Sequence, residues 1–262
     1  MGDRITQEGI RGLLPEAHKA RLCIEVLESI VSTNDYLKQT EPVKECTYRV
    51  VIAEEQTGGK GRRGKQFLSP RECGIYLSIQ FQIQDAGASY AQELTALSAI
   101  AACRAIETHT NKQPLIKWPN DVYCDGKKVC GILCESQIEA YSGKPSSFIA
   151  GIGIDVYKPG ISQIAAESIG YLAEAEEQGL RNRLIASLIE QLIALQIEGT
   201  EGAREEYRKR SMLLGRDIVL QYDDSRCIQA YVEDINDQLQ LLVKNTDGSH
   251  DVLDMGNFSI SF

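Results

Sequence analysis

The sequence predicts an α+β fold in which a mixed sheet with packed helices is followed by a small C-terminal β-barrel. Runs of β-branched and aromatic residues such as 48–55 predict strands, and these cluster as hairpins instead of alternating strictly with helices. Segments 89–108 and 180–197 are amphipathic at helical spacing, which predicts helices that pack on a sheet. After residue 207 the sequence changes to short strands separated by turns, which predicts the appended barrel.

Five segments of the first two hundred residues have the composition of strands. Residues 74–83 alternate apolar and polar side chains in their second half, the pattern of a strand with one solvated face. Ser32 begins a run of helix-capping residues, so a helix is expected to start there. Residues 142–145 read Ser-Gly-Lys-Pro and predict a hairpin connection. The predicted strands are 21–30, 48–55, 74–83, 128–138 and 147–156.

The C-terminal region is expected to contain five strands in about fifty residues. Turn-forming residues separate them at 223–225 and at 245–248. The predicted strands are 217–221, 227–233, 239–243, 251–253 and 258–262.

Composition and charge exclude several function classes. A net charge of −9 argues against a general nucleic-acid binder, and the acidic residues between 167 and 206 are interpreted as a solvated surface. The eight cysteines and three scattered histidines show no zinc-ligand spacing, so buried reduced thiols are expected. The N-terminus lacks the apolar run of a signal peptide, and no stretch approaches the ~20 apolar residues of a membrane span. A cytoplasmic protein with no membrane partner is therefore expected.

The most unusual segment is the loop 58–65, Gly-Gly-Lys-Gly-Arg-Arg-Gly-Lys. Glycines let backbone N–H groups approach an anion, and the arginines add bidentate geometry for a carboxylate or phosphate. The alternative to an anion-binding loop is an ordinary solvated basic turn. A P-loop is disfavoured because Gln66 stands where Ser or Thr must bind Mg²⁺ and no helix start follows. A dinucleotide-binding fold at Gly151-Ile-Gly153 is disfavoured because the third glycine is absent and Pro159 follows.

Three further segments have the composition of a binding site. Residues 117–121, Lys-Trp-Pro-Asn-Asp, combine a cation, an aromatic ring and two polar side chains presented by a rigid turn. Lys128 precedes Gly131 by three residues on a predicted strand, and Ser32-Thr33-Asn34 sits at a helix start. Each has an ordinary alternative when taken alone: a common turn, a solvated strand edge and a helix cap.

Taken together, the order and spacing of these segments resemble the biotin protein ligases. The resemblance covers about residues 21 to 156, and Met255-Gly256-Asn257-Phe258 is similar to the small SH3-like barrel of the family. It implies a class II synthetase-like catalytic domain over 21–210, an SH3-like barrel over 211–262 and a short N-terminal segment, 1–20. That segment is too short for the DNA-binding winged helix that some members carry, whether the helix was lost or trimmed.

The resemblance also implies a reaction and its participants. Biotin would be activated by ATP with Mg²⁺ to biotinyl-5′-AMP and transferred to a lysine of a biotin carboxyl carrier protein domain; a homodimer is conceivable. Arg62, Lys128 and Asp121 would be catalytic. The implied biotin-binding residues are Ser32, Thr33, Asn34, Gln56, Gly59, Lys60, Gly61, Arg62, Lys128, Gly131 and Gly153. The implied ATP-binding residues are Arg63, Phe67, Lys117, Asn120 and Asp155.

The sequence departs from the usual family pattern at three positions. Lys60 replaces an arginine and loses its bidentate geometry. Asp155 replaces an asparagine, which predicts a group on the metal side of ATP because a free carboxylate would repel the phosphates. Phe67 replaces a tryptophan and is expected to cover an adenine face.

Two other functions stay open at this point. One is a lipoate–protein ligase, which the basic glycine loop disfavours. The other is a regulatory module that binds biotinyl-adenylate without efficient transfer, which the presence of both Arg62 and Lys128 disfavours.

Overall fold

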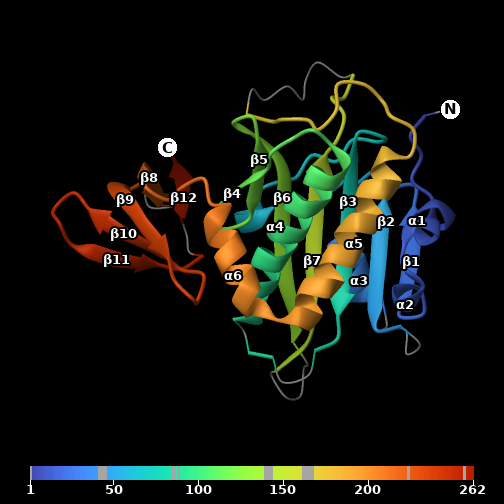
Figure 1. Ribbon diagram of the computed structural model, residues 1–262, viewed down its shortest axis with the longest axis horizontal. Coiled ribbons are helices and arrows are strands. Elements are labelled where there is room, and N and C mark those ends of the chain that lie inside the picture. Colours follow the sequence, from blue (N-terminus) through green and yellow to red (C-terminus); the bar gives the residue numbers. More distant parts are fainter. Residues whose placement is uncertain are drawn as a thin grey trace.

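A computed structural model of the chain consists of one large mixed sheet with helices on both faces and a second, C-terminal sheet (Figure 1). It describes residues 2–40, 46–83, 86, 87, 89–138, 144–160, 168–222, 225–255 and 258–262. The expected hairpin residues 142 and 143, the turn residues 223 and 224, and residues 256 and 257 of the barrel motif lie outside the described residues.

The large sheet has seven strands in the order β1-β2-β3-β7-β6-β5-β4. β1 and β2 pair in parallel, whereas the other neighbours are antiparallel. Its strands are β1 (Leu22–Leu27), β2 (Tyr48–Ala53), β3 (Gly74–Phe81), β4 (Leu115–Lys117), β5 (Asp121–Cys124), β6 (Lys127–Ile138) and β7 (Pro145–Asp155). The predicted mixed sheet is therefore confirmed, and the short β4–β5 hairpin adds two strands to it.

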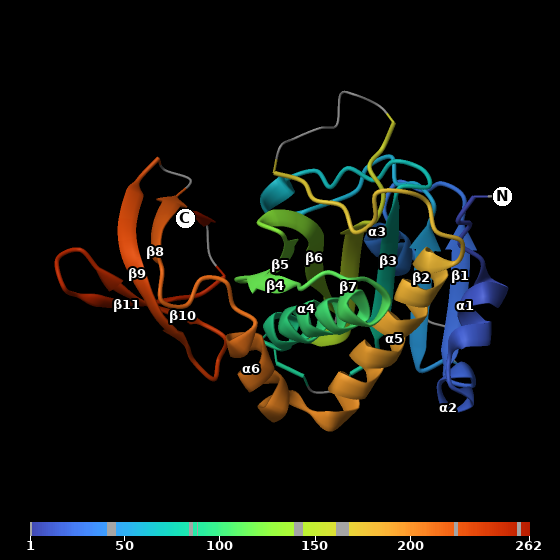
Figure 2. The same cartoon turned by 45° about the horizontal axis from the view of Figure 1, so that its top comes forward.

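Both faces of this sheet are covered. Helices α4 (Tyr90–His109) and α5 (Leu180–Glu198) lie across one face, and α3 (Thr33–Gln39) lies on the other (Figures 1 and 2). The prediction that β3 has a solvated face was wrong, because all eight of its residues are buried. Its polar side chains are hydrogen-bonded instead of solvated: Ser78 contacts Asn34 of α3 at 2.6 Å, and Gln80 donates to Gln137 at 2.7 Å.

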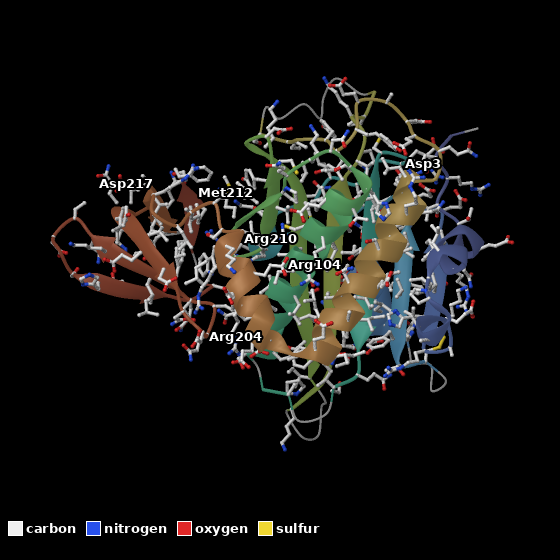
Figure 3. All side chains as sticks on the ribbon, viewed as in Figure 1. Asp3, Arg104, Arg204, Arg210, Met212 and Asp217 are labelled. Carbon is white, nitrogen blue, oxygen red and sulfur yellow. A yellow bond between two sulfur atoms is a disulfide. The ribbon has the colours of Figure 1, made fainter. Side chains whose placement is uncertain are left out.

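The N-terminal residues pack into the same body. Helices α1 (Gln7–Leu13) and α2 (Glu16–Lys19) lie next to β1, and Pro15 separates them. Ile5, Ile10 and Leu14 belong to the main apolar core. Asp3 lies at the N-terminal end of α5 (Figure 3), where its carboxylate accepts hydrogen bonds from the backbone of Gly179 and Arg181.

The C-terminal region forms a five-stranded antiparallel sheet in the order β11-β10-β9-β8-β12. Helix α6 (Thr200–Lys209) connects it to the large sheet (Figure 2). All five strands were predicted, but among the described residues no ladder joins β11 to β12, so the expected barrel is observed as an open sheet. The strands are β8 (Asp217–Tyr222), β9 (Cys227–Ile235), β10 (Leu241–Asn245), β11 (His250–Leu253) and β12 (Phe258–Ser261).

The expectation of buried reduced thiols was wrong for Cys23, Cys46 and Cys227, and Cys73 and Cys134 are free but only partly buried. Cys23 of β1 and Cys46 form a disulfide with their Cα atoms 5.7 Å apart, and Cys227 is exposed. Cys103, Cys124 and Cys130 are buried and free, as expected. In the described ranges no group of three or more Cys, His, Asp or Glu is placed to hold a metal ion. Within the same ranges no helix is both long and apolar enough to cross a membrane.

Candidate active site

One cavity of about 370 Å³ gathers almost all the residues that the sequence singled out. It lies beside α3, under the basic glycine loop, and extends to the β4–β5 turn and to β12. Of the predicted residues, the following line it: Ser32, Thr33, Asn34, Gln56, Lys60, Gly61, Arg62, Arg63, Phe67, Lys117, Asn120, Asp121, Lys128, Gly131 and Gly153. Segments more than a hundred residues apart in sequence, such as those of Ser32 and Gly153, thus meet in one site.

Two predicted residues lie off this cavity. Gly59 is buried under the loop, where an added Cβ would come within 2.4 Å of the backbone oxygen of Phe67. A residue with a side chain would not allow the loop to pack this closely. Asp155 lines a second cavity of about 200 Å³, described below.

One end of the main cavity is a connected group of polar side chains. Ser32 caps helix α3, and its neighbour Thr33 donates both its backbone N–H and its hydroxyl to Gln56 Oε1, at 2.9 and 3.1 Å. The Gln56 amide in turn donates to Ser69 Oγ at 3.0 Å. This pairing fixes the amide orientation, so the site presents donors and acceptors in a defined pattern.

The glycine loop closes over the cavity and is held at two points. Lys60 Nζ lies 2.6 Å from Asp35 Oδ2 in the first turn of α3, which raises the pKa of Lys60. On the other side Arg62 Nη1 donates to Asn120 Oδ1 at 3.1 Å. The bend that follows Arg62 uses left-handed backbone at Arg63, φ 58°, and at Gly64, φ 70°. A non-glycine residue in this conformation is a local strain of the kind found at functional sites.

Cations dominate the cavity although the whole chain is acidic. Burial lowers the pKa of Arg62 and of Lys117, since desolvation disfavours the charged forms. An anion in the cavity would offset that cost. The cations lining it are Lys60, Arg62, Arg63, Lys65, Lys117 and Lys128.

Asp121 is the carboxylate that faces these cations among the described lining residues. Its Oδ1 lies 2.6 Å from Lys128 Nζ, and this ion pair joins β5 to β6. The preceding turn contains a cis peptide bond between Trp118 and Pro119. The Asn120 side-chain amide donates to the Ile132 carbonyl at 2.9 Å, so the side chains of Asn120 and Asp121 are both held by residues of β6.

Phe67 forms the partition between the main cavity and the second one. Its ring lies against Gly153, where an added Cβ would meet ring carbons at 2.4 Å, so only glycine fits there. The second cavity is lined by Phe67, Lys128, Asp155, Tyr157, Pro159 and Tyr171, among others. Burial raises the pKa of Asp155 to about 7, and the nearby Lys128 lowers it only in part.

Sequence reasoning missed the contribution of the C-terminal sheet to the site. Phe258, Ser259 and Ile260 of β12 form part of the cavity wall. Trp118 stacks on Phe258 with the ring centroids 6.1 Å apart, and its indole N–H donates to the Leu239 carbonyl at 2.8 Å. No local pattern in the sequence signals this pairing, because it depends on how the two sheets meet.

Comparisons with known proteins agree with this geometry. Residues 26–155, which include most of the cavity lining, match the biotin/lipoate A/B protein ligase family. The chain carries a domain of this family.

Curated relatives of the chain include three bacterial proteins. The Bifunctional ligase/repressor BirA of Escherichia coli strain K12 is 30% identical over 184 residues, 68% of this chain and 55% of that protein. BirA of Bacillus spizizenii is 39% identical over 107 residues, 41% of this chain and 32% of that protein. The chain thus spans about a third to a half of the length of these two. The Biotin--[acetyl-CoA-carboxylase] ligase of Mycobacterium tuberculosis is 26% identical over 228 residues, with 83% of this chain and 82% of that protein covered.

The fold also has solved counterparts. The biotin protein ligase from Aquifex aeolicus in complex with biotin and ATP superposes with a TM-score of 0.73 at 22% identity, covering 91% of this chain and 98% of that one. The Leishmania major biotin protein ligase with biotinyl-5-AMP gives a TM-score of 0.58 at 20% identity, covering 88% and 98%. The α+β fold predicted from sequence is that of these ligases.

Proposed function

We propose that the chain is a biotin–protein ligase that activates biotin with ATP and transfers it to a lysine of a biotin carboxyl carrier protein domain. The observation that carries the proposal is the single cavity that joins a fixed polar pocket at Gln56 to a cluster of cations under a closed loop. Relatives and solved counterparts are named for biotin, ATP and biotinyl-5-AMP.

Biotin would bind with its ureido ring at the polar end. A desolvated ureido group has two N–H donors and one carbonyl acceptor, and each needs a partner. Ser32, Thr33 and Gln56 supply hydroxyl and amide groups in a prearranged network. Asn34 lies at the same end, where Gly151 leaves room for its amide. Gly131 and Gly153 would let the backbone approach the ligand.

The carboxylate of biotin would then point toward Lys128 and Arg62. Joining a carboxylate to the α-phosphate of ATP brings anions together, and cations in a water-poor cavity offset that repulsion. Arg62 is held by a neutral amide, Asn120, so it can exchange that partner for a phosphate at small cost. Gly61, Lys60 and Arg63 would complete the lid over the adenylate.

The nucleotide base would occupy the second cavity. Phe67 and Tyr171 offer aromatic faces there, and Lys128 borders both cavities, so the α-phosphate would lie between them. Lys117 and Asn120 would face the phosphates. Aromatic walls suit a purine ring.

Mg²⁺ would enter with the ATP phosphates. Magnesium in such sites uses one or two protein carboxylates and takes its other ligands from phosphates and water, so a dedicated acidic cluster is not needed. Asp155 is the candidate carboxylate: it lines the second cavity together with Lys128, and desolvation raises its pKa to about 7. The alternative role for Asp155 is to bind the nucleotide base. An Asp155→Asn variant separates the two roles: the Mg²⁺ dependence of adenylate formation should change if Asp155 binds the metal and stay the same if it binds the base.

Transfer requires the acceptor lysine to attack as a neutral amine. Asp121 lies at the cavity wall with its carboxylate paired to Lys128, so it could position that amine and accept its proton once Lys128 turns to the ligand. The mechanism needs no nucleophilic side chain of the chain itself.

Trapping of the intermediate tests the first half of this proposal. Incubation with biotin, ATP and Mg²⁺ should leave biotinyl-5′-AMP bound to the protein, measured by mass after gel filtration. Arg62→Gly should release the adenylate at least about ten-fold faster, the loss expected for one charge-assisted contact of about 1.5–3 kcal/mol. Arg71→Gly is the matched control, because Arg71 pairs with the exposed Glu28 outside the cavity.

Two outcomes would contradict the proposal. If lipoate replaces biotin at equal concentration with equal adenylate yield, the chain is a lipoate ligase. If adenylate forms but no carrier lysine gains biotin, the chain is a regulatory module that binds the intermediate. Equal adenylate release from the Arg62 and Arg71 variants would remove the clamp from the mechanism.

A further inference from the structure

The turn that presents Asn120 and Asp121 is braced by a side chain from outside the catalytic sheet. Tyr207 of α6 donates its hydroxyl proton to the Pro119 carbonyl at 2.8 Å, and this is a buried hydrogen bond. The Tyr207 side chain is 1% exposed. Burial raises its pKa, so the hydroxyl stays a donor at any physiological pH.

Tyr207 also lies within electrostatic range of two of the charged groups of the site, Arg62 and Asp121. Arg62 and Asp121 both act electrostatically on the Tyr207 hydroxyl, and its hydrogen bond to the Pro119 carbonyl places it at the turn itself. The Pro119 carbonyl immediately precedes Asn120, whose side chain accepts from Arg62. The hydrogen bond from Tyr207 therefore acts on the residue next to Asn120, and Asn120 in turn holds Arg62 of the glycine loop.

Helix α6 is itself fixed, so the brace is rigid. Arg104 of α4 contacts Glu206 at 2.6 Å, and Arg210 contacts Glu107 of α4 at 2.6 Å (Figure 3). Just beyond α6 the chain pairs with β4: the Ile116 N–H donates to Arg210 O at 2.8 Å, and the Met212 N–H donates to Ile116 O at 2.9 Å. The segment 207–212 thus supports both β4 and the turn that follows it.

We propose that Tyr207 is a positioning residue: its hydroxyl holds the Pro119 carbonyl so that Asn120 and Asp121 face the reacting groups. Through it, the C-terminal part of the chain sets the geometry of the reaction without touching the substrates. This inference rests on the proposed ligase function for its kinetic consequence, but the bracing of the turn can be measured without any activity.

The perturbation is Tyr207→Phe, which deletes one hydroxyl and leaves the ring in place. A buried carbonyl that loses its donor is left unsatisfied, and the turn can relieve this only by moving. The matched control is Tyr48→Phe. Tyr48 is 4% exposed, and its hydroxyl donates to Gln196 of α5 at 3.1 Å, among residues that do not line the cavity.

Two measurements are made on each variant. The first is acrylamide quenching of the intrinsic fluorescence of Trp118, the single tryptophan of the chain, which belongs to the braced turn and is 2% exposed. The second is the steady-state kinetics of biotin transfer, with KM for biotin and kcat determined separately. We expect Tyr207→Phe to increase Trp118 quenching and to lower kcat about ten-fold with an unchanged KM for biotin, since the pocket at Gln56 is not touched.

The outcomes discriminate between the inference and the function on which it rests. Unchanged Trp118 quenching in the Tyr207 variant, or a kcat within two-fold of the wild type in an active protein, overturns the positioning role. An equal loss of kcat in Tyr48→Phe also overturns it, because the effect would then be one of general stability. An inactive wild-type protein whose Trp118 still loosens in Tyr207→Phe contradicts the proposed function and supports the brace.

Discussion

Replacement of Arg181 by methionine should cost the fold more than any substitution on its surface. The Arg181 side chain is 1% exposed and lies between two buried carboxylates. It contacts Glu54 Oε2 at 2.7 Å and Asp3 Oδ2 at 3.5 Å, and it donates to the Gly74 carbonyl at 3.2 Å. Methionine retains most of the apolar volume but leaves both carboxylates without their cation.

The magnitude follows from what remains buried. Asp3 and Glu54 are 4% and 3% exposed, so neither can be solvated without moving the chain around it. Breaking a buried pair from one side costs about 3–5 kcal/mol, which for a chain of this size lowers Tm by roughly 10 °C. Asp3 keeps its hydrogen bonds from Gly179 and Tyr157, so the N-terminal segment should stay attached at that point.

Urea unfolding followed by circular dichroism measures the free energy of unfolding of the variant. The control is Arg183→Met on the same helix, because Arg183 pairs with Glu177 at the surface, where such pairs contribute at most about 1 kcal/mol. Addition of Glu54→Gln to Arg181→Met should recover part of the loss, since it removes one buried charge. A free energy of unfolding for Arg181→Met within about 1 kcal/mol of the wild type would refute the reasoning.

Three further predictions concern the site. Asp155→Asn should stabilise the protein more at pH 8 than at pH 5. The folded state holds the Asp155 proton up to a pH of about 7, whereas the unfolded state releases it near the ordinary pKa of aspartate, so the stability of the wild type falls as pH rises between these two values. Thermal melts of both proteins at several pH values measure the difference. Gly59→Ala should open the loop, because its Cβ would lie 2.4 Å from the Phe67 backbone oxygen, and faster tryptic cleavage at the loop cations would reveal it. Asp35→Asn removes the partner of Lys60 and should speed adenylate release by less than about five-fold, because the ion pair is partly exposed. Added salt should also speed adenylate release from the wild type, and a release rate that salt leaves unchanged would argue against this contact.

Local sequence patterns predicted the elements whose structure is decided locally. Residues 48–53 include three β-branched residues and an aromatic one and are all buried, so composition located β2. Residues 180–198 place most of their leucines and isoleucines on one buried helical face, so periodicity located α5. The half-solvated pattern of β3 misled because Ser78 and Gln80 are buried by hydrogen bonds to other elements, which periodicity does not contain.

The residues of the site were predictable because its motifs keep their order along the chain, but their arrangement in space was not. The resemblance to the biotin protein ligases brought Gln56, Arg62 and Lys128 into one hypothesis, and the structure places all three on one cavity. Asp155 lines the second cavity behind Phe67, and its expected place beside the phosphates stays a prediction. The strand β12 and Tyr207 reach the site only through the packing of the C-terminal region, and no short-range signal records such contacts.

The central claim is tested most directly by mass spectrometry of an acceptor. The full chain is incubated with biotin, ATP, Mg²⁺ and a biotin carboxyl carrier protein domain, and the carrier is weighed and its modified residue mapped. The account predicts that the carrier gains the mass of one biotinyl group on its single target lysine, and that Lys128→Ala abolishes the gain. An unmodified carrier in the presence of the folded wild-type chain would contradict it.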